Sequence, residues 1–95
     1  MAYTITQHTK NRAKEHGVKV KPSSKKHKKI DVIKGGEIIA SVGDKRYPDY
    51  GVLLQKEARG QVKAGTANER RRAYHARHGR YAKGTRGYWA SELLW

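Results

Sequence analysis

A β-hairpin is predicted by the stretch IDVIKGGEIIASV, residues 30–42. Two runs rich in Ile and Val alternate as strands with one buried face do, and a pair of glycines separates them. A three-residue loop over residues 34–36, with a glycine at the positive-φ position, would gather the apolar side chains on one face. That face would hold Ile30, Val32, Ile38, Ala40 and Val42. Ile33 and Ile39 would lie on the opposite face and cover a second contact.

Positive charge is concentrated on both sides of this hairpin. Residues 1–29 carry nine Lys/Arg and one acid, residues 30–57 carry four and five, and residues 58–95 carry nine and two. The 95 residues together have a formal net charge of +14. Because the charge is segregated, we expect both ends of the chain to contact a polyanion while the middle folds.

One small domain preceded by a basic arm is the expected organisation. Residues 1–29 contain short alternating segments, but Pro22-Ser23-Ser24 and the lysine-rich run that follows interrupt them. We predict an extended basic arm over residues 1–29 that orders only on a partner, because it has too little apolar area to offset its chain entropy. Residues 30–95 would form an α+β domain: a small β-hairpin or three-stranded sheet packed by two C-terminal helices.

Two helices are predicted after the hairpin. Thr66 precedes Glu69 by three residues, the capping-box spacing, which predicts a helix from about Ala67 to His78 that Gly79 ends. A second short helix is predicted within residues 88–94. The apolar residues 52–54 fit a helix and an irregular segment equally well.

The first of these helices carries arginines on several faces, with Tyr74, His78 and Tyr81 along one of them. Guanidinium groups bind phosphate oxygens and stack on rings, which suits a nucleic-acid backbone. They equally suit the carboxylates of a neighbouring acidic protein, and the composition fits both partners. Together with lysines of the arm, the candidate anion contacts are Lys25, Lys26, Lys28, Lys29, Arg70, Arg71, Arg72, Arg77 and Arg80.

Aromatic residues of the last third are the candidate protein contacts. The sequence ends in YWASELLW, residues 88–95, which would promote aggregation if it were exposed. Core packing is the simpler expectation for Trp89 and Leu93, whereas Trp95, the last residue, is the better candidate for docking into another subunit. The interface candidates are Tyr74, Tyr81, Trp89 and Trp95.

No catalytic or metal centre is expected. The chain has no Cys, and no Ser lies beside a His in a recognisable nucleophile motif. His75 and His78 are one helical turn apart, but arginines surround them and no acid completes a ligand shell. The aspartates are explained as strand and turn residues, so they do not form the carboxylate cluster of a nuclease. We expect a non-enzyme without cofactor, metal or small-molecule substrate.

A membrane partner is also not expected. No apolar run approaches the roughly 18 residues of a membrane span, and the N-terminus lacks the apolar stretch of a signal peptide. We expect synthesis in the cytoplasm.

Three motifs carry a resemblance. They are IASxGxxxYxDY at residues 39–50, the pair Arg71-Arg72 followed by Tyr74 and by Arg77-His78, and YWAxxLLW at residues 88–95. Through them, residues 29–95 resemble small basic proteins encoded by large DNA viruses of protists and by tailed phages. That group has no assigned activity, so the resemblance transfers no catalytic residue. It implies a viral gene product that acts as a virion component or as a genome-associated factor.

These observations lead to one expected function and one alternative. The expected function is that of a non-enzymatic viral structural protein, a minor capsid or internal virion component. Its basic ends would contact acidic protein surfaces, expected to be those of capsid subunits, or packaged DNA. The alternative is a sequence-nonspecific nucleic-acid-binding protein that acts in the infected cell.

Overall fold

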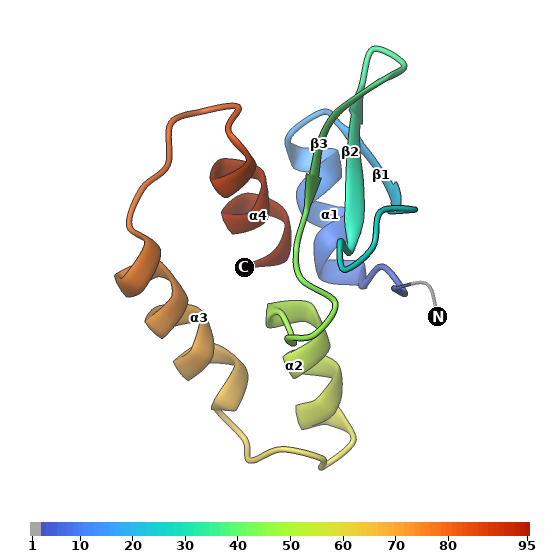
Figure 1. The fold of residues 1–95 in the computed structure, drawn as a ribbon. Coiled ribbons are helices and arrows are strands. Elements are labelled where there is room, and N and C mark those ends of the chain that lie inside the picture. Colours follow the sequence, from blue (N-terminus) through green and yellow to red (C-terminus); the bar gives the residue numbers. More distant parts are fainter. Residues whose placement is uncertain (1–2) are drawn as a thin grey trace.

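The predicted hairpin lies in a three-stranded antiparallel sheet in the computed structural model, which describes residues 3–95 (Figure 1). The strands are β1 (Lys19–Pro22), β2 (Ile30–Lys34) and β3 (Glu37–Val42), and β2 is central. The helices are α1 (Gln7–Glu15), α2 (Tyr50–Ala58), α3 (Thr66–His78) and α4 (Arg86–Leu94). The α+β class is thereby confirmed.

The β2–β3 connection is tighter than the predicted three-residue loop, which is wrong. Lys34 pairs with Glu37, so only Gly35 and Gly36 connect the strands, with φ angles of 60° and 80°. A tight hairpin turn of this kind requires positive φ at both central positions, and glycine adopts it without strain. The missing loop residue appears instead as a β-bulge at Ile39, where the register shifts by one.

The bulge produces the buried face that the loop was expected to produce. Val32 lies opposite Ala40, and Ile30 lies opposite Val42, with all four side chains buried. Ile38, the fifth residue of the predicted face, precedes the bulge and is 53% exposed. The core is thus built from the half of the hairpin that lies far from the turn.

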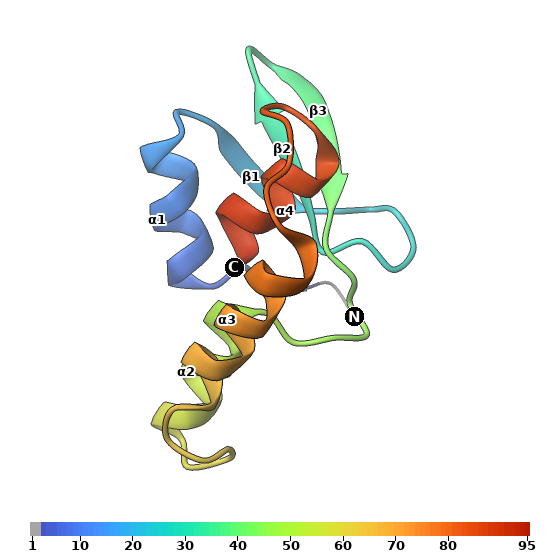
Figure 2. The same ribbon diagram turned by 90° about the vertical axis from the view of Figure 1, so that its left-hand side faces the viewer.

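Two helices cover this face of the sheet. Ala13 and Val18 from the α1 region and Trp89, Leu93 and Leu94 from α4 complete the buried cluster. Both figures place the β2–β3 turn at one end of the molecule and the α2–α3 pair at the other (Figures 1 and 2). Of the two predicted C-terminal helices, α4 therefore packs on the sheet, whereas α3 packs on α2.

The extended basic arm that we predicted is not seen in the described residues. Instead, residues 7–15 form α1, and β1 pairs with β2 across the expected domain boundary at residue 29. The helix begins at the N-cap Thr6, whose side chain accepts a hydrogen bond from the Thr9 amide. Thr9 and Ala13, one turn apart, are its buried positions.

Contacts with α4 explain how so polar a helix is held. The Thr9 hydroxyl donates to the Leu93 carbonyl at 2.8 Å, and Arg12 Nε donates to the Glu92 carbonyl at 2.9 Å. These carbonyls lie in the last turn of α4, where intrahelical donors run out. Arg12 also forms an ion pair with the Glu92 carboxylate at 2.7 Å. Helix α4, near the other end of the same chain, therefore provides the contacts that hold residues 7–15 in place.

The start of α3 differs from the predicted capping box. Gly65, with φ of 92°, is the N-cap residue, and the Thr66 hydroxyl donates to the Lys63 carbonyl instead of capping the helix. The amide of Ala67, in the first turn of α3, donates to the carboxylate of Glu57, which belongs to α2, at 2.6 Å. The helix ends as predicted, with Gly79 as the C-cap residue. The carboxylate of Glu57 thus caps the first turn of α3, the role that the sequence predicted for Thr66.

Candidate polyanion-binding surface

The acidic side chains of the protein are largely occupied by internal contacts. Six of the eight carboxylates accept hydrogen bonds from groups of the same chain: Glu15, Asp31, Asp44, Asp49, Glu57 and Glu92. Within residues 3–95, the Lys/Arg side chains that form ion pairs are Arg12, Lys29 and Arg46. Most of the cationic charge therefore faces outward without a carboxylate beside it.

One group of cations lies at the end of the sheet where β1 connects to β2. Lys25 and Lys26 are exposed and Lys28 is half-buried. The connection from β3 to α2 lies beside them, because the Lys45 amide donates to the His27 carbonyl at 2.9 Å. We call Lys25, Lys26, Lys28 and Lys45 the loop cluster. Sequence reasoning missed Lys45, because only strand pairing brings it to the other lysines.

Lys29 does not belong to this cluster, which corrects the prediction of an anion contact there. Its side chain is 4% exposed, and its ammonium lies 2.8 Å from Asp49 Oδ2. The Tyr3 hydroxyl donates to the same oxygen at 2.6 Å. Burial and the negative charge of Asp49 raise the pKa of Tyr3 well above its ordinary value. Lys29 is thus enclosed in an internal network and cannot reach an external phosphate.

The arginines of α3 divide into two groups. Arg70, Arg72 and Arg77 are exposed on the helix, as is Arg80 just beyond it. Arg71 is engaged within the chain: its Nε donates to the Trp95 carbonyl at 2.7 Å, and its guanidinium lies 4.8 Å from the centre of the Tyr50 ring. We call Arg70, Arg72, Arg77 and Arg80 the α3 arginines.

The predicted interface aromatics pack mostly on one another. Tyr74 stacks on Trp95 at 4.7 Å between ring centres and on His78 at 4.2 Å. Tyr81 continues this row, since its hydroxyl lies 2.7 Å from His78 Nδ1. Trp89 is 7% exposed in the core, so the core expectation is confirmed and its place among the interface candidates is corrected. Trp95 is half-buried and covers Tyr74.

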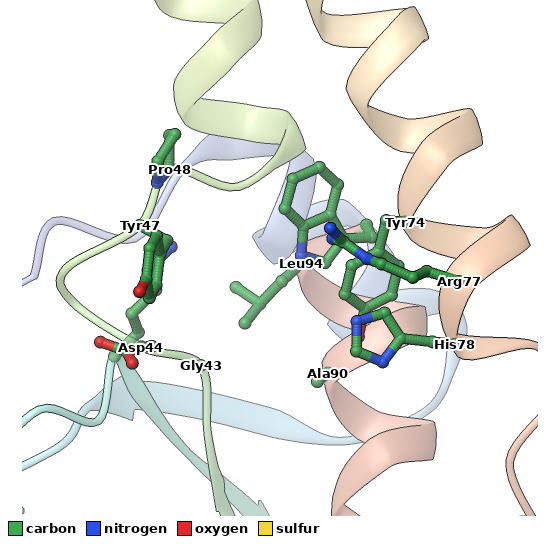
Figure 3. A pocket seen from close by; sticks show the side chains of 11 residues that line it. Gly43, Asp44, Tyr47, Pro48, Tyr74, Arg77, His78, Ala90 and Leu94 are labelled. Atoms are coloured by element: carbon green, nitrogen blue, oxygen red, sulfur yellow. The ribbon is translucent and has the colours of Figure 1, made fainter.

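An open cavity of about 310 Å³ lies beside this row of rings. The connection from β3 to α2 forms one wall of the cavity, and α3 and α4 form the other (Figure 3). Sequence analysis did not identify it, because residues 43–48 of one wall and residues 74–95 of the other are distant along the chain.

Two classes of site find no support in the described part of the chain. Residues 3–95 contain no group of three or more His, Cys, Asp or Glu side chains placed to hold a metal ion. Within the same residues, none of the helices combines the length and the apolar character needed to cross a lipid bilayer. The exposed cations and the adjacent cavity are therefore the features on which a functional proposal can rest.

Comparisons with known proteins add no relative: no family model, no curated protein and no solved structure matches this chain.

Proposed function

We propose that the protein is a non-enzymatic basic component of a virus particle that binds packaged DNA through its surface cations. The observation that carries this proposal is the separation of charge in three dimensions. Six of the eight carboxylates are engaged in internal contacts, while Lys25, Lys26 and the α3 arginines are exposed to solvent. Cations without an acidic partner displace the counterions of a nucleic acid when they bind its phosphates. The release of these counterions drives association that does not depend on sequence.

Guanidinium groups next to exposed rings favour DNA over an acidic protein surface. Arg77 lines the same cavity as the Tyr47 ring, which is 65% exposed, so phosphate and base contacts are available side by side. The virion setting rests on the resemblance of residues 39–50 and 88–95 to proteins of large DNA viruses and phages. A nucleic-acid-binding role in the infected cell uses the same surface and differs only in location.

DNA binding is tested by measuring the affinity for a double-stranded fragment as NaCl rises from about 50 to 200 mM. We expect the affinity to fall steeply and without marked sequence preference, because phosphate contacts dominate. Arg70→Gln should reduce the salt slope by about 0.9. Lys34→Gln is the matched control, because it removes the same charge from an exposed lysine at the β2–β3 turn, away from the loop cluster and the α3 arginines.

Two results would contradict the proposal. An affinity that does not change with NaCl would exclude phosphate-driven binding, and equal effects of Arg70→Gln and Lys34→Gln would exclude a defined surface. Mass spectrometry of purified particles, with and without the genome, tests the location. Absence from the particles would favour the role in the infected cell.

A further inference from the structure

The cavity beside the aromatic row has walls of different character. Tyr47 and Pro48 stand on one side, Arg77 and His78 stand on the other, and Leu94 lies between them (Figure 3). Tyr47 is 65% exposed although it is aromatic, so its ring has little contact with the rest of the protein. The guanidinium of Arg46 lies 5.9 Å from the centre of the Tyr47 ring.

Small residues leave this space open. Ala90 of α4 lines the cavity with a single methyl group, and Gly43 lines it at the end of β3. Gly43 has φ of 87°, and a Cβ there would lie 2.7 Å from Leu94 Cδ1. The chain therefore passes directly over Leu94, and an apolar floor remains between two walls that both carry rings.

The charge at the rim indicates what kind of ring would enter. Arg77 and His78 lie on one wall, and Arg77 has no carboxylate within ion-pair distance among residues 3–95. The acid of the opposite wall, Asp44, is held by Arg46, whose guanidinium donates to both carboxylate oxygens at 2.8 to 3.2 Å and whose amide donates to Oδ1 at 2.9 Å. These contacts keep the pKa of Asp44 well below its ordinary value. Arg77 is thus the cation of the rim that has no acidic partner among the described residues, and it complements an aromatic group that carries an anion.

We propose that this cavity binds an unpaired nucleobase of a DNA strand, with Arg77 contacting the adjoining phosphate. The inference rests on the proposed function and adds to it a contact that double-stranded DNA cannot make. A base offers a planar ring that can pack on the apolar floor and on Tyr47. Its phosphate offers the negative partner that Arg77 lacks. Stacking of this kind tolerates any base, so it is consistent with binding that has no sequence preference.

The test compares two single-stranded probes with the same number of phosphates. One is an oligothymidylate of about 12 nucleotides, and the other is an abasic strand of equal length. At about 200 mM NaCl, where the phosphate contribution is weakened, the wild-type protein should bind the thymidylate about 5- to 100-fold more tightly. Tyr47→Ala should remove much of this difference while leaving the affinity for the abasic strand unchanged.

Two further variants define the site. Ala90→Phe should fill the cavity and so also remove the difference in affinity between the two probes. A thermal melt of this variant checks that the fold is retained. Arg70→Gln is the matched control, because Arg70 is an exposed arginine of α3 that does not line the cavity. It should weaken binding of both probes alike and leave their ratio intact.

The outcomes separate this inference from the proposed function. Equal wild-type affinity for the two probes overturns the base pocket and leaves DNA binding in place. A preference for thymidylate that survives in both Tyr47→Ala and folded Ala90→Phe also overturns it, because the bases would then be read elsewhere. Failure to bind either probe or double-stranded DNA overturns both proposals.

Discussion

Replacing Lys29 by Met would remove the cation that neutralises Asp49 inside the protein. The ammonium and the carboxylate are 2.8 Å apart, with side chains that are 4% and 1% exposed. Met retains most of the aliphatic volume of Lys, so the change isolates the loss of charge. The Asp49 carboxylate would then be buried without a counterion, which is the costly way to break a buried ion pair.

The expected loss can be worked out from the remaining partners of Asp49. Removing one member of a buried pair typically costs about 3–5 kcal/mol. Tyr3 still donates to Oδ2 and the Val52 amide still donates to Oδ1, so we expect the lower end, about 3 kcal/mol. A domain of this size has a total stability of about 5–14 kcal/mol. The melting temperature should fall by about 12–24 °C.

Thermal and urea unfolding, followed by far-ultraviolet circular dichroism, measure this loss. Lys28→Met is the matched control, because Lys28 is the adjacent residue and its amine has no carboxylate beside it among the described residues. It should change stability by no more than about 0.5 kcal/mol. Asn keeps an N-cap acceptor, so adding Asp49→Asn to Lys29→Met should recover part of the loss.

A small effect would refute the reasoning. If Lys29→Met melts within a few degrees of Lys28→Met, the pair is not buried in solution, and residues 3–29 are closer to the extended arm that the sequence suggested. Lys29 would then return to the candidate anion contacts.

Three further predictions concern other parts of the fold. Burial lowers the pKa of His8, so as the pH falls the unfolded chain binds a proton at this residue before the folded protein does. The contribution of neutral His8 to the free energy of unfolding is therefore complete above about pH 6.5 and is lost as the pH decreases through the pKa of the folded state. His8→Phe should reduce the difference between melting temperatures at about pH 7.5 and pH 5.5, and an unchanged difference would contradict this. Gly51→Ala would place a Cβ against the Thr6 hydroxyl, which caps α1, and should cost about 1–3 kcal/mol in urea unfolding; an unaltered midpoint would argue against this approach of α1 and α2. Trp95→Ala should lower stability by more than about 1 kcal/mol through loss of the stack on Tyr74, whereas an unchanged melting temperature with blocked incorporation into particles would support docking of Trp95 into another subunit.

Local patterns predicted the elements whose partners are near in sequence. The alternation around Gly35-Gly36 identified β2 and β3, and Gly79 identified the end of α3. The same alternation could not distinguish a longer loop from a tight turn with a bulge, since both place Val32 and Ala40 on one face. The helical period also placed Tyr74 and His78 on one side of α3, where they do stack.

Partners far apart in the sequence account for the differences. The α1 helix is polar and buries only Thr9 and Ala13, so its own sequence resembles a solvated segment. Its donors Thr9 and Arg12 are matched by the carbonyls of Leu93 and Glu92 in α4, 84 and 80 residues away. The charge of Lys29 likewise gives no sign of burial until Asp49 is brought to it from another segment. Sequence reasoning treats each cation as solvated unless a local partner is visible.

The amino-acid sequence by itself determined the α+β class, the hairpin and the segregated positive charge, because alternation, glycine positions and formal charge are local properties of the chain. The tertiary structure alone decided which cations face solvent and where the cavity lies. Burial and ion pairing depend on groups from distant segments meeting at distances of a few ångströms, and such meetings have no local signature. The same lysine-rich run therefore supplies the exposed Lys25 and Lys26 to the surface and the buried Lys29 to the interior.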